Sequence, residues 1–86
     1  MTMDRRIRER LEAAFSPSIL EVLNESHLHA GHAGSPNSGQ SHFRVYVVSE
    51  KFFGCSRVER HRLVNEVLAQ ELAGGVHALA IKAEAP

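Results

Sequence analysis

A helix-forming segment with clear start and stop signals lies between two β-rich segments in the second half of the chain. Ser56 and Glu59 have capping-box spacing, in which each side chain satisfies a free amide of a first helical turn. Gly74 and Gly75 supply the stop, because glycine adopts the left-handed conformation without a Cβ clash. Strand-helix-strand units cross over with one handedness, so the two flanking strands should run parallel if they pair directly.

Residues 42–49 form the β-rich segment before this helix, and residues 76–83 form the one after it. The first is rich in β-branched and aromatic side chains, which favour strands. The second is apolar on both predicted faces, so we expect it to be well covered. Parallel neighbours begin at the same end of a sheet, which would bring His77 close to His42 and to the loop before it.

The first third of the chain adds one helix and one strand. Apolar residues recur at helical spacing from Asp4 to Phe15, and Ser16-Pro17-Ser18 ends that helix. Residues 19–26 then alternate between apolar and polar, as a strand does. The order α-β-β-α-β predicts an α/β (α+β) fold with a three-stranded mixed sheet, as one domain over residues 1–86. The helices should pack on the sheet through six apolar residues: Ile7, Leu11, Phe15, Val64, Leu68 and Leu72.

Composition excludes several classes of function. The 86 residues suffice for one small core, and ten basic residues balance ten acidic ones. Zero net charge removes the long-range field of a dedicated nucleic-acid or membrane-surface binder. The single cysteine, Cys55, fits a reducing compartment. Without an apolar run long enough to span a bilayer or a signal-peptide pattern, we expect a soluble cytoplasmic protein.

A Gly/Ser-rich loop at about 27–41 connects the first two strands and carries His27, His29 and His32. Imidazole is the commonest protein metal ligand and also handles protons near neutral pH. Metal capture is therefore one interpretation of the loop, and a solvated hairpin loop is the other.

His77 and a histidine of this loop could together form a two-histidine metal site at one end of the sheet. Two protein ligands leave a metal site half empty, so binding by the chain alone should be weak. A partner that supplies the remaining ligands is part of this hypothesis. The alternative is that His77 is a hydrogen-bonded residue at a strand end.

The start of the second long helix carries a basic group, formed by Arg57, Arg60, His61 and Arg62. Exposed amides and the helix dipole also favour anions there, so the group could contact nucleic acid, phosphate or an acidic partner. The alternative is an ordinary solvated helix face with His61 partly buried.

Cys55 precedes the helix and is either a reactive thiol or a small turn residue. No paired carboxylates, nucleophile motif or phosphate-binding glycine loop indicates an enzyme.

Several motifs in their order along the chain resemble the BolA family. They are Asn24-Glu25-Ser26-His27, His29-Ala30-Gly31-His32, Ser41-His42-Phe43-Arg44-Val45, Val48-Ser49, Phe53-Gly54, Arg60-His61-Arg62-Leu63-Val64 and Val76-His77-Ala78-Leu79. The resemblance implies a fold similar to the class II KH domain. It also implies a heterodimer with a monothiol glutaredoxin, in which the two proteins share a [2Fe-2S] cluster.

In the family pattern the BolA side supplies the histidine at the start of the last strand, here His77, and a histidine or cysteine from the first loop. The matching loop residue is His29, with His32 as a competitor. The expected function is a non-enzymatic adaptor in iron-sulfur trafficking or iron and redox regulation. Glutaredoxin and glutathione thiolates would hold the other iron, and the isolated chain, a monomer or weak dimer, would bind no cluster tightly.

The resemblance also leaves an alternative, a DNA-binding transcriptional regulator of stress response and cell morphology that acts through the basic group. A nucleic-acid-binding KH domain clamps the backbone with a Gly-x-x-Gly loop. The corresponding turn here is Phe53-Gly54-Cys55-Ser56, which lacks the second glycine. This departure and the zero net charge favour the adaptor.

Overall fold

The computed structural model describes residues 2–26 and 42–86. Their helices and strands follow the predicted order, with a short 3-10 helix added and the second long helix divided. The elements are α1 (Met3–Phe15), β1 (Ile19–Asn24), β2 (His42–Val48), η2 (Glu50–Phe52), α2 (Arg57–Val67), α3 (Ala69–Ala73) and β3 (Ala78–Glu84).

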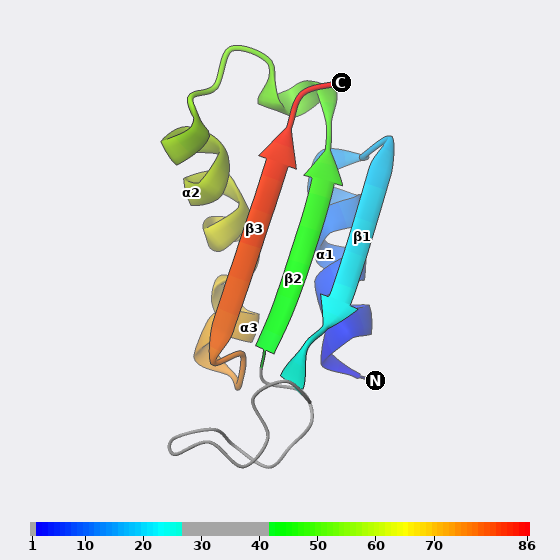
Figure 1. Ribbon diagram of the computed structural model, residues 1–86, viewed down its shortest axis with the longest axis vertical. Coiled ribbons are helices and arrows are strands. Elements are labelled where there is room, and N and C mark those ends of the chain that lie inside the picture. The colour runs from blue at the N-terminus through cyan, green and yellow to red at the C-terminus, as the bar shows by residue number, and fades with distance from the viewer. Residues whose placement is uncertain (1, 27–41) are drawn as a thin grey trace.

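The three strands form one mixed sheet in the order β1-β2-β3, as predicted. β1 pairs with β2 antiparallel, and β2 pairs with β3 in parallel. Figure 1 shows α1, α2 and α3 on one face of the sheet, while no helix of the described residues covers the other. The starts of β2 and β3 therefore lie at the same end of the sheet, where β1 ends.

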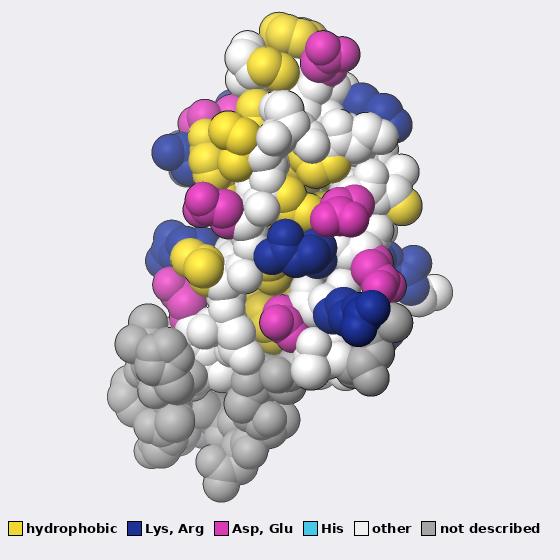
Figure 2. Space-filling view, turned by 90° about the vertical axis from the view of Figure 1, so that its right-hand side faces the viewer, with side chains coloured by type: hydrophobic (Ala, Val, Ile, Leu, Met, Phe, Trp, Pro, Cys, Tyr) yellow, Lys and Arg dark blue, Asp and Glu magenta, His cyan; other side chains and the backbone are white. Residues whose placement is uncertain are grey.

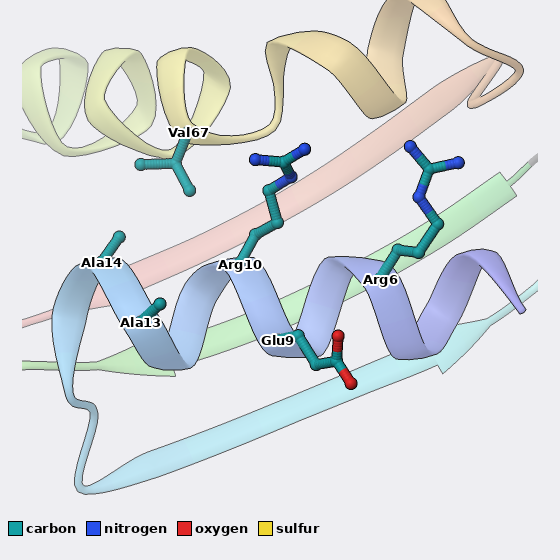
Figure 3. A pocket seen from close by; sticks show the side chains of 6 residues that line it. All are labelled: Arg6, Glu9, Arg10, Ala13, Ala14 and Val67. Carbon is teal, nitrogen blue, oxygen red and sulfur yellow. The ribbon is translucent and has the colours of Figure 1, made fainter. Parts of the chain in front are cut away.

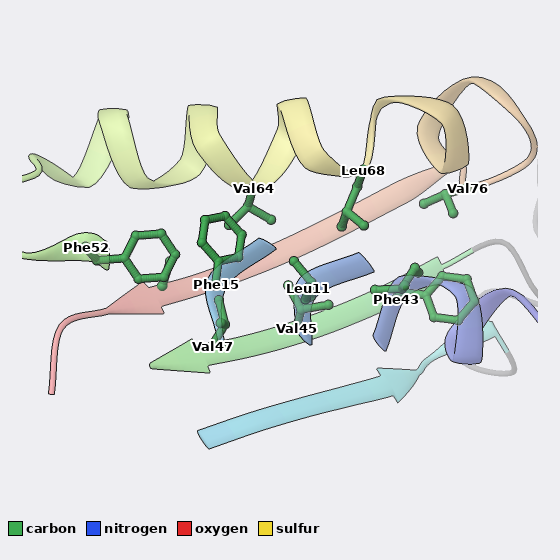
Figure 4. Packing of buried hydrophobic residues seen from close by; sticks show 11 residues of the cluster. Leu11, Phe15, Phe43, Val45, Val47, Phe52, Val64, Leu68 and Val76 are labelled. Atoms are coloured by element: carbon green, nitrogen blue, oxygen red, sulfur yellow. The ribbon is translucent and has the colours of Figure 1, made fainter. Parts of the chain in front are cut away.

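The hydrophobic core lies between the sheet and the helices (Figure 4). Alternate residues of β2 point into it, and they meet the predicted apolar residues of α1 and α2. Leu72, the sixth predicted residue, also packs against this core but is only partly buried. Phe52, Val76 and Ala83, which the predicted set omitted, also belong to the buried cluster. The other members of the buried cluster are Ile7, Leu11, Phe15, Phe43, Val45, Val47, Val64 and Leu68.

Three predicted element boundaries were wrong. The second long helix does not run unbroken, because the backbone of Leu68, between α2 and α3, leaves the helical conformation with a φ of −97° and a ψ of 16°. β1 ends at Asn24, two residues early. The last strand begins at Ala78, after His77, and only Ala83 among its residues is buried, so the prediction that both of its faces are well covered was also wrong. All helices pack on one face, which leaves the outward residues of β3 exposed.

Glu71 joins the short helix α3 to α1. Its carboxylate is fully buried, and its Oε2 atom accepts hydrogen bonds from Arg6 Nη2 at 3.1 Å and Arg10 Nε at 3.0 Å. Figure 3 shows the two arginine side chains extending from α1 toward the helix above it. Arg10 also donates to Gln70. The two guanidinium groups offset the cost of burying this charge.

The predicted capping box begins α2. The amide of Glu59 donates to Ser56 Oγ at 3.1 Å, and the amide of Ser56 donates to Glu59 Oε1 at 3.1 Å. The Ser56 amide and hydroxyl lower the pKa of the Glu59 carboxyl below its ordinary value. A carboxyl with a lowered folded pKa adds stability above its unfolded pKa, and that stability is lost as the pH falls through the folded pKa.

We expect Ser56→Ala to lower the free energy of unfolding by about 1 kcal/mol at neutral pH, because it removes this cap. Urea titration measures the loss. The effect of the substitution should shrink in acid, where Glu59 is protonated and its half of the box is weakened. An unchanged free energy of unfolding at neutral pH would contradict a stabilising role for the cap.

Candidate metal site

His42 and His77 lie side by side at one end of the sheet. Their ring centroids are 5.5 Å apart, and the ring planes are tilted by 47°. His42 is the first residue of β2, and His77 directly precedes β3. This confirms the prediction that parallel pairing of the two strands brings these histidines together.

Hydrogen bonds at the start of β2 fix the backbone of His42. Its amide donates to Ser26 Oγ at 3.0 Å, and its carbonyl oxygen accepts from the Glu25 amide at 2.8 Å. The Ser26 amide in turn donates to Asn24 Oδ1 at 3.0 Å. These contacts use the three residues of the Asn-Glu-Ser motif, which begins at the last residue of β1. His42 is buried with 7% of its surface exposed, so it is a fixed part of the sheet end.

A tight turn after α3 positions His77 beside His42. The carbonyl oxygen of Glu71 accepts hydrogen bonds from the amides of Gly74 at 3.2 Å and Val76 at 3.1 Å. A Cβ atom at Gly74 would lie 2.9 Å from the Gln70 carbonyl oxygen, and Gly75 has a φ of +135°. Both glycines are therefore required by the turn. Val76 is buried in the core, whereas His77 is exposed to solvent.

The predicted loop histidines His27, His29 and His32 lie outside the described residues, which stop at Ser26 and resume at His42. Ser26 and His42 contact each other at the end of the sheet that holds the histidine pair. Within residues 2–26 and 42–86, no group of three or more His, Cys, Asp or Glu side chains could hold a metal ion. The His42–His77 pair is thus the part of the candidate site that the described residues supply.

In the predicted basic group, some side chains are exposed to solvent and one is held by hydrogen bonds to the backbone. Arg57 and Arg62 are exposed on α2, and His61 is half-buried as predicted. Arg60 instead donates to the carbonyl oxygens of Ala83 at 2.6 Å and Cys55 at 2.7 Å, which ties α2 to β3. Three of the four side chains therefore remain on the surface of α2, while the fourth supports the fold.

Cys55 lies in the turn before α2 and is half-buried. Its Sγ atom is 3.9 Å from the Lys51 carbonyl oxygen. Cys55 comes after the C-terminal end of β2, whereas His42 is the first residue of that strand. The two residues therefore lie toward opposite ends of β2. The thiol is thus not part of the histidine pair.

The contribution of Glu71 was not predicted from the sequence. A glutamate near the end of an amphipathic helix is normally a solvated residue, and only the arginines at helical spacing in α1 could have indicated a buried partner. Through its carboxylate and its carbonyl, Glu71 connects α1 to the turn that carries His77.

Comparisons with known proteins agree on one family. The family model for BolA-like protein matches residues 11–86. BolA-like protein 1 of Mus musculus is 55% identical over 84 residues, which cover 98% of this chain but only 58% of the mouse protein. The DNA-binding transcriptional regulator BolA of Vibrio cholerae is 51% identical over 75 residues, covering 87% of this chain and 67% of that protein.

A solved structure gives the same result for the fold. The BolA domain of SufE1 from Arabidopsis thaliana is 44% identical and superposes with a TM-score of 0.90, covering 100% of this chain and 94% of that one. Among the described residues, no helix is both long and apolar enough to cross a membrane.

Proposed function

The chain belongs to the BolA-like protein family, and from this premise we propose that it is a non-enzymatic adaptor that shares a [2Fe-2S] cluster with a monothiol glutaredoxin. The observation that carries the proposal is His77, an exposed imidazole at the sheet end where the described residues stop at Ser26 and resume at His42. The proposed ligands from this chain are His77 and one loop histidine, His29 or His32.

The residues present fit this role chemically. Imidazole is an established ligand of the [2Fe-2S] cluster, where histidines replace cysteines on one iron and raise the reduction potential. His77 is exposed, so a cluster held by a partner can reach it without unfolding this chain. The thiolates of the glutaredoxin and of glutathione would hold the second iron.

This chain's own contribution is positioning. The Glu71 carbonyl and the two glycines fix the turn that presents His77, while the sheet fixes His42 beside it. An imidazole held on the end of a paired strand loses little conformational freedom when it binds a metal, which favours binding. The neighbouring His42 ring restricts the space on one side of His77.

Reconstitution tests the proposal. The chain is mixed with a monothiol glutaredoxin, glutathione, iron and sulfide under anaerobic conditions, and the visible absorption and circular dichroism of the purified complex are recorded. We expect a 1:1 complex whose spectrum differs from that of the glutaredoxin cluster alone. The chain without glutaredoxin is the control and should hold no stable cluster. A glutaredoxin spectrum that this chain does not change would contradict the adaptor function.

The loop ligand can be identified by comparing two substitutions in the same complex. We expect His29→Ala to change the visible circular dichroism more than His32→Ala, because His29 has the family's spacing from the Asn24-Glu25-Ser26 motif. Equal spectra for the two variants and the unsubstituted chain would contradict a role for either loop histidine. A larger effect of His32→Ala would assign the ligand to His32.

DNA binding is the second candidate function, and it is favoured by the exposed arginines on α2 and by the relative in Vibrio cholerae. Arg57 and Arg62 are the side chains on α2 that could contact phosphates, whereas Arg60 is held by β3. Figure 2 shows basic and acidic groups interspersed on the face around β1, so that face does not carry charge of a single sign. A gel shift at several salt concentrations tests this function, because phosphate contacts weaken steeply with salt.

A further inference from the structure

A groove of about 410 Å³ lies between α2 and the outer edge of β3. β3 is an edge strand, because it pairs with β2 on one side and no strand of the described residues pairs with it on the other. Figure 1 shows α2 beside this outer edge, and the two elements are in contact. The groove is lined by residues 81–84 of β3 and by Arg57, Arg60 and His61 of α2. Since consecutive residues of β3 line it, the groove opens onto the backbone edge of the strand.

Two hydrogen bonds show which backbone groups of β3 point into the groove. The carbonyl oxygen of Glu84 accepts from the Ser49 amide at 3.0 Å, so the backbone of Glu84 faces β2. Successive residues of a strand turn their backbone groups to opposite sides. The Ala83 carbonyl therefore points outward, where it accepts from Arg60 Nε at 2.6 Å. Ile81, two residues earlier, also points outward, and its amide and carbonyl have no hydrogen-bond partner among the described residues.

The groove carries an excess of basic side chains. Arg57 and His61 lie on its α2 side, and Lys82 borders it from the open face of the sheet. Glu84 is the acidic residue of the lining, and its carboxylate lies 3.9 Å from Lys82 Nζ. Both of these side chains are exposed, so their ion pair is weak and leaves Lys82 available to another carboxylate. The charge of the groove therefore suits an acidic ligand.

We propose that this groove binds a short acidic peptide segment of a partner protein, which adds to the sheet as a strand beside β3. Strand addition to an exposed sheet edge is a general mode of peptide recognition, in which main-chain hydrogen bonds give affinity and alternate side chains give specificity. The inference goes beyond the proposed adaptor function and does not depend on it. His77 precedes the first residue of β3, whereas the groove borders residues 81–84 at the other end of the strand.

The geometry specifies the sequence of the peptide. In an antiparallel pair, the peptide residue opposite Ile81 exchanges both backbone hydrogen bonds with it and turns its side chain toward α2, where Arg57 and His61 lie. The neighbouring peptide residue faces the opposite side of the sheet, where Lys82 lies. Two consecutive acidic residues therefore match the groove. Arg60 already occupies the next outward carbonyl, so the pairing ends there and the segment is short.

A nucleic-acid strand fits this groove less well. Its sugar-phosphate backbone does not carry the alternating amide donors and carbonyl acceptors that would pair with Ile81. The turn Phe53-Gly54-Cys55-Ser56 before α2 also lacks the second glycine of the loop that clamps a nucleic-acid backbone. The peptide is therefore the ligand that the observations favour.

NMR of the full ¹⁵N-labelled chain tests the proposal with the synthetic peptide acetyl-Thr-Val-Glu-Glu-Val-Thr-amide. We expect the Ile81 amide proton to shift downfield as it gains a hydrogen bond. Two control peptides separate the contributions of charge and of strand pairing. One has lysines in place of both glutamates, and the other keeps the glutamates but is N-methylated at both, which removes their amide donors. Neither control should shift the Ile81 amide.

Charge-reversal variants complete the test. Lys82→Glu should weaken binding of the glutamate peptide by roughly tenfold, because it replaces an attraction by a repulsion of similar size. Lys82 is 66% exposed, so its substitution leaves the core intact. Arg62→Glu is the matched control, since Arg62 is exposed on α2 but does not line the groove, and it should leave the affinity nearly unchanged.

Three results would overturn the proposal. The first is an Ile81 amide that the glutamate peptide leaves unshifted or that the N-methylated peptide shifts equally. The second is unchanged affinity in the Lys82→Glu chain. The third is a single-stranded oligothymidylate that shifts the same amides at lower concentration than the peptide, which would assign the groove to nucleic acid.

Discussion

His77→Ala should abolish or strongly alter the visible circular dichroism of the cluster-bound complex with a monothiol glutaredoxin. The substitution removes the one proposed ligand that the structure describes, and no neighbouring Cys, Asp or Glu of the described residues completes a site in its place. Loss of an iron ligand changes the electronic asymmetry that produces the circular dichroism. The side chain is exposed, so the free energy of unfolding of the variant should stay within about 0.5 kcal/mol of that of the unsubstituted chain.

Cys55→Ser is the matched control for this experiment. Cys55 is the only thiol of the chain and lies in the turn before α2, away from the histidine pair. Its substitution should leave the spectrum of the complex nearly unchanged. A Cys55 variant that loses the cluster, together with a His77 variant that keeps it, would show that the ligand assignment is wrong, although membership of the family would stand.

Glu71→Ala should lower the free energy of unfolding by roughly 3 kcal/mol, because removing one partner of a buried ion pair breaks the network and leaves a cavity. The fully buried carboxylate binds two arginines of α1, so its loss separates α1 from α3. For a domain this small, such a loss is a large fraction of the total stability. Urea unfolding of the chain without metal or partner measures it.

Glu66→Ala gives the comparison, since Glu66 is an exposed glutamate on the neighbouring helix α2. Its substitution should change the free energy of unfolding by less than about 0.5 kcal/mol. Equal, small losses for the two variants would contradict a structural role for the Glu71 network. Glu71→Gln, which keeps the shape and one acceptor oxygen, should lie between the two alanine variants.

Local signals explain why most of the fold was predictable. Ser56 and Glu59 identify the start of α2 by their capping-box spacing, and Gly74 and Gly75 identify the turn before β3. The parallel pairing followed from the strand-helix-strand order alone. The break at Leu68 and the exposed face of β3 were not predictable in this way, because both depend on how the helices share one face of the sheet.

The candidate site was predictable in part for the same reason. Parallel strands begin at one end of a sheet, so the adjacency of His42 and His77 needed only the strand order. The role of Glu71 needed knowledge of which α1 residues face α3, which a sequence pattern does not provide. The assignment of the loop ligand rests only on its spacing from the family motif, since His29 and His32 lie outside the described residues.

The most direct test of the shared cluster labels the histidines of this chain alone with ¹⁵N. The labelled chain is combined with an unlabelled monothiol glutaredoxin and glutathione, the cluster is reduced by one electron, and pulsed EPR measures its couplings to nitrogen. We expect ¹⁵N couplings of the size given by directly bound imidazole, with one of them lost in the His77→Ala chain. A reduced cluster in the 1:1 complex with no ¹⁵N coupling would contradict ligation by this protein.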